Sequence, residues 1–220
     1  MEGDKTMNQL AKALLEIEAV TLAPTTPYTW ASGLRSPIYC DNRLTLSSPA
    51  VRTLIADQLA ERIRPLNADV IAGTATAGIP HAALVAERLG LPMIYIRGSA
   101  KGHGKGNQIE GRLQAGQRVV VVEDLLSTGM SSIEATQAVE AAGATVVRIQ
   151  AIFSYGMSRL KENLTVAEVE ADALLTFTEL LETAVETAYI SKKEQDALRT
   201  WSVDPVKWSE AFLAVSKQNG

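Results

Sequence analysis

The stretch "VVVVEDLLSTGMSS", residues 119–132, changes character in its middle. Four valines are followed by the acids Glu123 and Asp124, and then by small hydroxyl residues around Gly129. An unbroken apolar run of this kind favours a central strand of a parallel sheet, covered by helices on both faces. We therefore expect the two acids at the carboxyl end of a buried strand, which is where ligands bind in open α/β sheets.

Strand and helix patterns alternate on both sides of this stretch. The expected strands are 68–73, 92–97, 118–123 and 145–154. The expected helices are 8–20, 49–64, 78–90 and 131–143. Two more helices are expected near the C-terminus, where the Ser191/Glu194 capping box and Asp204–Pro205 mark their starts. Helices of 10–15 residues between short apolar strands are typical of βαβ units. The expected fold is α/β, a doubly wound, mainly parallel sheet with extra helices at both ends.

Length and composition are consistent with one domain, residues 1–220, in a reducing compartment. The chain has 220 residues, 46% of them hydrophobic, and a single cysteine, Cys40, which rules out an internal disulfide. The polar N-terminus carries no signal peptide pattern, and no apolar run reaches the roughly 20 residues that span a bilayer. The net charge of −4 argues against a general nucleic-acid binder. We expect a cytoplasmic protein without membrane or nucleic-acid partners.

The residues after the acids are suited to binding an anion. A turn that leads into a helix presents backbone N–H groups and the positive end of the helix dipole. Hydroxyls at positions 127, 128, 131 and 132 add donors, while the acids offer only acceptors, as a vicinal diol requires. A ribose 5-phosphate has both features. The alternative is a pair of solvated acids followed by an ordinary helix cap, and the complete pattern favours the ligand site.

A second unusual segment is rich in glycine and in cations. Five of the fifteen glycines lie within 98–111, together with Lys101, His103 and Lys105, and Arg97 and Arg112 flank them. Many glycines oppose regular structure, so we expect a mobile loop. Its cations could close over a polyanion and exclude water. A flexible, solvated connection between strands is the alternative.

Five segments together resemble a known family. "VVVVEDLLSTGMSS" resembles the 5-phosphoribosyl 1-diphosphate (PRPP) binding motif of type I phosphoribosyltransferases. Residues 28–43, 73–92, 95–111 and 189–208 resemble orotate phosphoribosyltransferases in the same order. The resemblance implies transfer of ribose 5-phosphate from PRPP to orotate, in pyrimidine biosynthesis. It also implies Mg²⁺, held mainly through PRPP and water, and a homodimer whose subunits share their active sites.

The resemblance also implies roles for individual residues. The implied catalytic residues are Lys101, His103, Glu123 and Asp124; these four also bind PRPP, together with Arg97, Leu125, Leu126, Ser127, Thr128, Gly129, Met130 and Ser131. Ser127, Ser32, Gly33 and Arg35 are the implied orotate-binding residues, from a hood at about 21–45.

The chain departs from the family pattern at several positions. Gly98 stands where many members carry a lysine, as does Ala31, and Thr76-Ala77 replaces a Tyr-Lys pair. These departures indicate a subgroup and leave the cation that faces the orotate carboxylate unassigned, with Arg35 as a candidate.

Two other functions remain open on the sequence. One is a phosphoribosyltransferase for another base, such as a purine, against which the hood-like segment 28–43 argues. The other is a regulator that keeps the fold and senses PRPP, against which the acidic charge argues.

Overall fold

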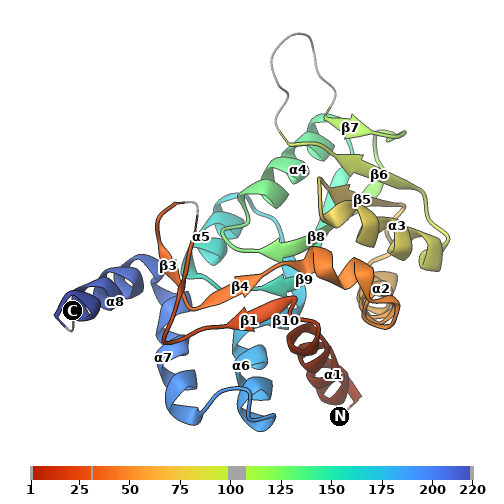
Figure 1. The fold of residues 1–220 in the computed structure, drawn as a ribbon. Helices are drawn as coiled ribbons and strands as arrows, with labels where there is room; N and C mark the ends of the chain where they lie inside the picture. Colours follow the sequence, from red (N-terminus) through yellow and green to blue (C-terminus); the bar gives the residue numbers. More distant parts are fainter. Residues whose placement is uncertain (1, 31, 99–107, 219–220) are drawn as a thin grey trace.

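The computed structural model describes the backbone of residues 2–30, 32–98 and 108–218, and the side chains of 9–30, 32–98 and 108–214. These residues contain a six-stranded sheet with the order β10-β9-β8-β5-β6-β7 (Figure 1). The strands are β5 (Val70–Thr74), β6 (Met93–Ile96), β7 (Ile109–Glu110), β8 (Arg118–Leu126), β9 (Thr145–Ser154) and β10 (Ala171–Thr176). All neighbours are parallel except β6 and β7, which confirms the predicted doubly wound, mainly parallel fold.

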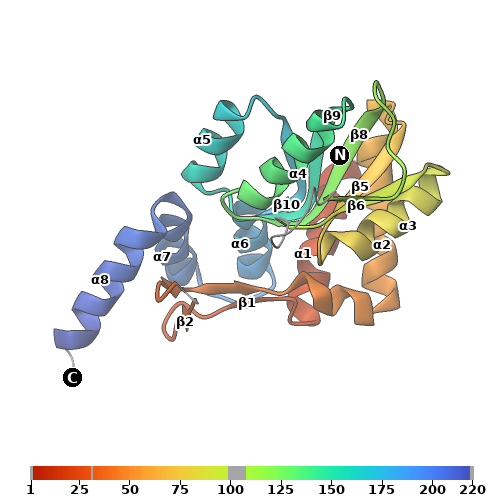
Figure 2. The ribbon, with the colours of Figure 1, turned by 90° about the horizontal axis from the view of Figure 1, so that it is seen from above.

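Helices cover both faces of this sheet (Figure 2). They are α1 (Glu2–Glu16), α2 (Pro49–Ile63), α3 (Gly78–Leu89), α4 (Met130–Ala141), α5 (Ser158–Val166), α6 (Phe177–Glu186), α7 (Lys192–Val203) and α8 (Pro205–Gln218). One apolar cluster joins α1, α2, α3 and α6 to Val120 and Val122 of β8, and a second joins α4 and α5 to Val119 and Val121. Successive side chains of a strand point to opposite faces, so the unbroken valine run supplies both clusters.

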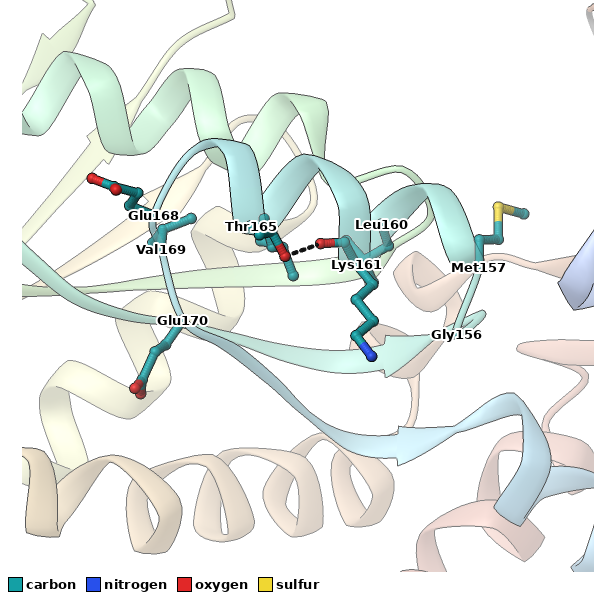
Figure 3. A pocket seen from close by; sticks show the side chains of 9 residues that line it. Gly156, Met157, Leu160, Lys161, Thr165, Glu168, Val169 and Glu170 are labelled. Atoms are coloured by element: carbon teal, nitrogen blue, oxygen red, sulfur yellow. Dashed lines mark hydrogen bonds between the residues drawn. The ribbon is translucent and has the colours of Figure 1, made fainter.

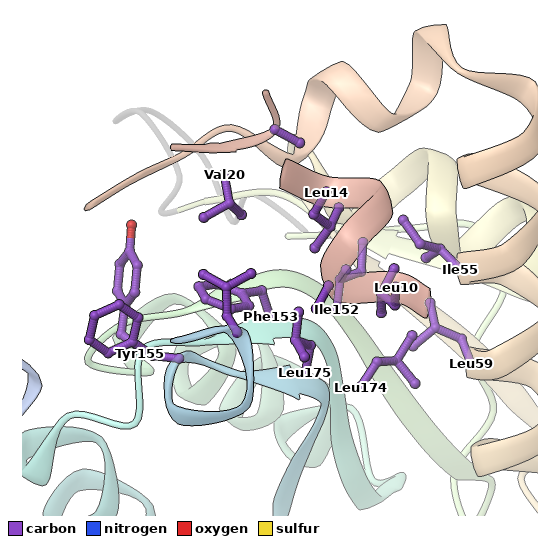
Figure 4. Close-up of a cluster of buried hydrophobic side chains, with 14 of the residues drawn as sticks. Leu10, Leu14, Val20, Ile55, Leu59, Ile152, Phe153, Tyr155, Leu174 and Leu175 are labelled. Atoms are coloured by element: carbon purple, nitrogen blue, oxygen red, sulfur yellow. The ribbon is translucent and has the colours of Figure 1, made fainter. Parts of the chain in front are cut away.

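The first cluster fixes the N-terminal helix on the sheet. Leu10 and Leu14 of α1 pack with Ile55 and Leu59 of α2 against β9 and β10 (Figure 4). All four side chains are 0% exposed. Burial of each contributes about 1.5–3 kcal/mol, so α1 is an integral part of the domain.

Several predicted boundaries were wrong, and the helix predicted to begin at residue 8 already begins at Glu2. The predicted helix 8–20 ends at Glu16, because Glu18 adopts a positive φ of 56° and Val20 begins strand β1 (Val20–Leu22). The strand predicted at 118–123 extends to Leu126, because β8 keeps pairing with β9 through Leu126. Glu123 and Asp124 therefore lie within the last residues of β8, and not beyond its end.

The segment predicted to form the hood, at about 21–45, contains short strands and leads into a 3-10 helix. Strand β1 pairs antiparallel with β4 (Ile38–Cys40), and β2 (Tyr28–Thr29) pairs with β3 (Arg35–Ser36) in a hairpin. The 3-10 helix η1 (Asn42–Ser47) follows directly, and a second one, η2 (Arg64–Leu66), ends α2. At the other end of the chain, the Ser191/Glu194 capping box is present at the start of α7. Within the described residues, no helix combines the length and the apolar character needed to cross a membrane.

Candidate active site

Glu123 is the buried carboxylate of the site. The residue is 5% exposed, and its two oxygens accept hydrogen bonds from four donors. The donors are Thr74 Oγ1 at 2.7 Å, the Asp124 backbone N–H at 3.0 Å, Ser131 Oγ at 3.3 Å and Ser132 Oγ at 2.8 Å. A carboxylate has about four lone-pair positions, so these donors saturate it. Glu123 therefore fixes the end of β5, the end of β8 and the start of α4 relative to one another.

These contacts lie at the point where the strand order of the sheet reverses. From β5 the chain moves outward to β6, and later returns to place β8 on the other side of β5. The carboxyl ends of the two strands at such a point enclose the crevice that binds ligands in open α/β sheets. Thr74 ends β5, and its hydroxyl donates to both Glu123 and the Val122 carbonyl, at 2.7 and 3.2 Å.

Asp124 is the half-buried acid of the pair. Burial, and next the hydrogen bond and negative charge of Glu123, raise the pKa of Asp124 from 3.8 to about 7. Its backbone carbonyl accepts a hydrogen bond from Asn42 Nδ2 at 2.7 Å. Ionising the Asp124 carboxylate is therefore costly in the folded chain, and a bound cationic ligand would favour the ionised form.

The turn after β8 keeps its donors free. Within the described residues, the backbone N–H groups of 127–131 and the hydroxyls of Ser127 and Thr128 make no hydrogen bond. Gly129 precedes α4 with a positive φ of 78°, a conformation that glycine adopts without a steric penalty. Unpaired N–H groups at the start of a helix form an anion site, because they and the helix dipole attract negative charge.

The hood contributes residues that sequence reasoning missed. The thiol of Cys40 lies close to the acids: burial, followed by the negative charges of Asp124 and Asp41, raises its pKa. Arg43 forms a two-point ion pair with Asp41, at 2.6 and 2.8 Å, and interacts electrostatically with Asp124. No local pattern marks these residues, because their role depends on the approach of segment 40–43 to β8.

Three of the four predicted orotate-binding residues, Ser32, Gly33 and Arg35, lie on the β2–β3 hairpin, whose described hydrogen bonds do not reach the acid pair. The Arg35 backbone N–H donates to Ser209 Oγ of α8 at 2.9 Å, and Arg35 Nη1 donates to Thr29 Oγ1 at 2.6 Å. Ser32 and Gly33 are exposed at the tip of the hairpin. None of the described hydrogen bonds joins these three residues to Ser127, so their role in binding orotate stays a prediction.

The predicted catalytic loop is described only at its two ends. Arg97 forms an ion pair with Glu110 at 3.1 Å, and its backbone N–H donates to the Gln108 carbonyl at 2.9 Å. Residues 109–110 form β7, so the regular structure begins before the predicted end of the loop at 111. Lys101 and His103 lie outside the described residues.

His81 lies in a buried polar group beneath the site. It is 0% exposed, and burial lowers the pKa of its imidazole to about 4. Its Nε2 lies 3.4 Å from Thr45 Oγ1, which also donates to the Asn42 carbonyl at 2.5 Å. This geometry indicates a structural role for His81.

Comparison with known proteins identifies the family. A family model described as "Phosphoribosyl transferase domain" matches residues 45–174. Orotate phosphoribosyltransferase of Listeria monocytogenes is 53% identical to this chain over 204 residues, covering 92% of this chain and 98% of that protein. The chain belongs to the orotate phosphoribosyltransferase family. Orotate phosphoribosyltransferase of Bacillus caldolyticus is also 53% identical, over 91% of this chain and 98% of that protein.

Solved structures of the same family share the fold. The orotate phosphoribosyltransferase of Aeropyrum pernix matches with a TM-score of 0.72 and 31% identity, over 83% of this chain and 99% of that one. UMP synthase of Leishmania donovani matches with a TM-score of 0.77 and 31% identity over 89% of this chain. The match covers 42% of that longer protein.

Proposed function

We propose that this chain transfers ribose 5-phosphate from PRPP to orotate and releases orotidine 5′-monophosphate and diphosphate, a step of pyrimidine biosynthesis. The observation that carries this function is the position of Asp124 beside the turn 127–131. Asp124 offers an acceptor for the ribose diol, and the turn 127–131 offers a set of unpaired N–H groups for a phosphate.

The two acids have different roles in this mechanism. Displacement at the anomeric carbon passes through an oxocarbenium-like state, so positive charge grows on the ribose while the diphosphate departs. Asp124 contacts the diol and stabilises that charge electrostatically. Glu123, whose oxygens are saturated by protein donors, holds Asp124 and α4 in place. No strong base is needed, because orotate can attack as its N1 anion.

Mg²⁺ fits the site as a metal carried by the substrate. Within the described residues, no group of three His, Cys, Asp or Glu side chains could hold a metal ion. The half-buried carboxylate of Asp124 suits a cation that keeps most of its ligands from phosphates and water. When bound, Mg²⁺ supplies positive charge to the departing diphosphate.

Arg43 and Arg35 are the two candidates for the cation that faces the orotate carboxylate. Arg43 interacts electrostatically with Asp124 and is oriented by Asp41, which favours Arg43. Arg35 contacts the C-terminal helix α8 through its backbone. Orotate KM should rise in Arg43→Ala and change little in Arg35→Ala if this ranking is right.

The shared site is proposed from the family resemblance and tested by complementation. If Lys101 and His103 serve the partner's site, Lys101→Ala and Asp124→Asn should each be nearly inactive. Random pairing of the two variants makes about half of the dimers mixed, with one sound site each, which restores roughly a quarter of wild-type activity. A mixture no more active than its parents, with subunit exchange verified by mass spectrometry, would contradict the shared site.

A substrate panel tests the function itself. Orotate, uracil, adenine and hypoxanthine are each incubated with PRPP and Mg²⁺, and orotate alone should be consumed efficiently. Faster turnover of a purine would favour the other transferase, and salt-sensitive nucleic-acid binding without turnover would favour a regulator. We expect the reaction in the cytoplasm, a reducing compartment that suits a chain with a single cysteine.

A further inference from the structure

Helix α5 contacts the phosphate-binding turn from outside, at two points. Asn163 Nδ2 donates to the Thr128 backbone carbonyl at 2.8 Å. Leu160 is the buried residue of α5, and an added Cβ at Gly129 would lie 2.6 Å from its Cδ1. The turn is therefore held against α5 by one hydrogen bond and one close apolar contact.

The hydrogen bond from Asn163 fixes the direction of a donor in the site. In a planar trans peptide, the C=O and the N–H of the next residue point in opposite directions. Because Asn163 binds the Thr128 carbonyl from the α5 side, the Gly129 N–H is directed away from α5. That N–H belongs to the unpaired donors of 127–131. A donor held in advance in its binding orientation costs less to order when a ligand arrives.

Two hollows flank α5, which is otherwise held by Leu160 and Leu164 in the second apolar cluster and by the bond from Ser158 Oγ to the Val203 carbonyl at 3.4 Å. On one flank a hollow of about 410 Å³ lies between Leu160 and Lys161 of α5 and the segment 168–170 (Figure 3). On the other flank a hollow of about 450 Å³ includes Met130 of α4 and Val166 of α5. Among the described hydrogen bonds, the bond from Asn163 is the only one from α5 to the turn 127–131.

We propose that Asn163 is a positioning residue for the phosphate of PRPP, acting through the Thr128–Gly129 peptide. The proposal rests on the function given above, in which the turn 127–131 binds that phosphate. Asn163 does not touch the substrate. It sets the affinity of the turn for phosphate and leaves the chemistry at the anomeric carbon to Asp124.

Steady-state kinetics of Asn163→Leu test this role. Leucine keeps the size of the side chain and removes the donor. The KM for PRPP should rise about fivefold to tenfold, the factor expected for one net hydrogen bond, with kcat and the KM for orotate within about twofold of wild type. Asn163→Ala, which favours the helix, should give the same change if the leucine variant does not fold.

Thr165→Val is the matched control on the same helix. It removes the bond from Thr165 Oγ1 to the Lys161 carbonyl, of 2.8 Å, which lies apart from the turn. This variant should keep the wild-type KM for PRPP. The proposal is overturned if both variants raise that KM equally, or if Asn163→Leu lowers kcat and leaves the KM for PRPP unchanged.

Calorimetric titration with ribose 5-phosphate separates this proposal from the function. If the wild type shows no turnover of orotate but binds ribose 5-phosphate more tightly than Asn163→Leu, the function fails and the role of Asn163 stands. Equal affinity of the wild type and the folded variant for ribose 5-phosphate would overturn the role of Asn163, whatever the turnover.

Discussion

Within residues 123–131, the acid end at Glu123 and the hydroxyl end at 127–131 differ in how far the protein pairs their polar groups. At the acid end, Glu123 is buried and all its acceptor positions are filled by protein donors. At the hydroxyl end, the N–H groups of 127–131 have no partner within the described residues. The difference separates stability from the proposed binding: the protein satisfies the acceptors of Glu123, and leaves unpaired the donors that we propose for the phosphate.

Asp124 stands between these two ends and should show the largest effect. Asp124→Asn keeps the size of the side chain and removes the charge opposite the oxocarbenium, so turnover should fall by roughly 10²–10³. Steady-state assays of the purified variant measure this, and circular dichroism checks its fold. Near-normal turnover would remove Asp124 from the catalytic role.

The same variant should be more stable than the wild type at high pH. The pKa of Asp124 is raised from 3.8 to about 7 on folding, so the protonated form favours the folded state. That stability is present below about pH 4 and is lost as the pH rises through about 7. The uncharged amide mimics the protonated acid, so Asp124→Asn should raise the Tm at pH 8 and leave it unchanged at pH 4. This contrast requires only thermal melts.

The pH dependence of catalysis follows from the same group. Catalysis needs the ionised form, so kcat/KM for PRPP in the wild type should fall about tenfold per unit as the pH drops below about 7. The ratio of wild-type to Asp124→Asn activity removes the titration of the substrate itself. A ratio that stays constant from pH 5 to 8 would show that Asp124 does not set the profile.

A change at the hydroxyl end should alter affinity alone. The Thr128 hydroxyl has no partner within the described residues, so Thr128→Val should leave the Tm unchanged. It removes one hydrogen bond to a charged phosphate, and the KM for PRPP should rise about tenfold. A loss of stability with an unchanged KM would mean that the hydroxyl end is structural too.

A change at the buried acid should alter stability first. Glu123→Gln replaces one acceptor by an NH₂ group, so the donors at that oxygen must reverse or lose their bond, and the other oxygen loses its charge-assisted bonds, at a cost of about 1–3 kcal/mol. The Tm should fall by about 2–4 °C for each kcal/mol lost. Glu134 is exposed, so the control variant Glu134→Gln should keep the wild-type Tm. Equal melting of both variants would abolish the contrast between the two ends.

Most of the sheet could be predicted from the sequence, because its signals are local. Strand β9 has the predicted bounds, 145–154, in a sequence rich in Val, Ile and Thr, and Gly143 and Gly90 end their helices with positive φ values of 83° and 66°. The segment from α5 to α6 was not predicted. The short pairs β1–β4 and β2–β3 were missed because two-residue and three-residue strands depend on tertiary pairing.

The candidate site divides in the same way. The acids and the turn are contiguous in the chain, so the sequence displays them together. Asn42 and Asn163 reach the same motif across 82 and 35 residues, and an asparagine in isolation carries no sign of its partner. Thr74 was missed for the same reason, since only strand order brings β5 beside β8.

Gly78 limits how freely this active site can change in evolution or in design. A methyl group there would lie 2.5 Å from Thr74 Oγ1 and 2.6 Å from the Val122 carbonyl. Those atoms form a bond that connects β5 to β8 beside the acid pair, so even alanine would push the two strand ends apart. In a library of variants in which position 78 is also randomised, substitutions of Gly78 would inactivate members whose ligand-binding residues are otherwise suitable. Position 78 should be kept as glycine before any residue in contact with the ligand is redesigned.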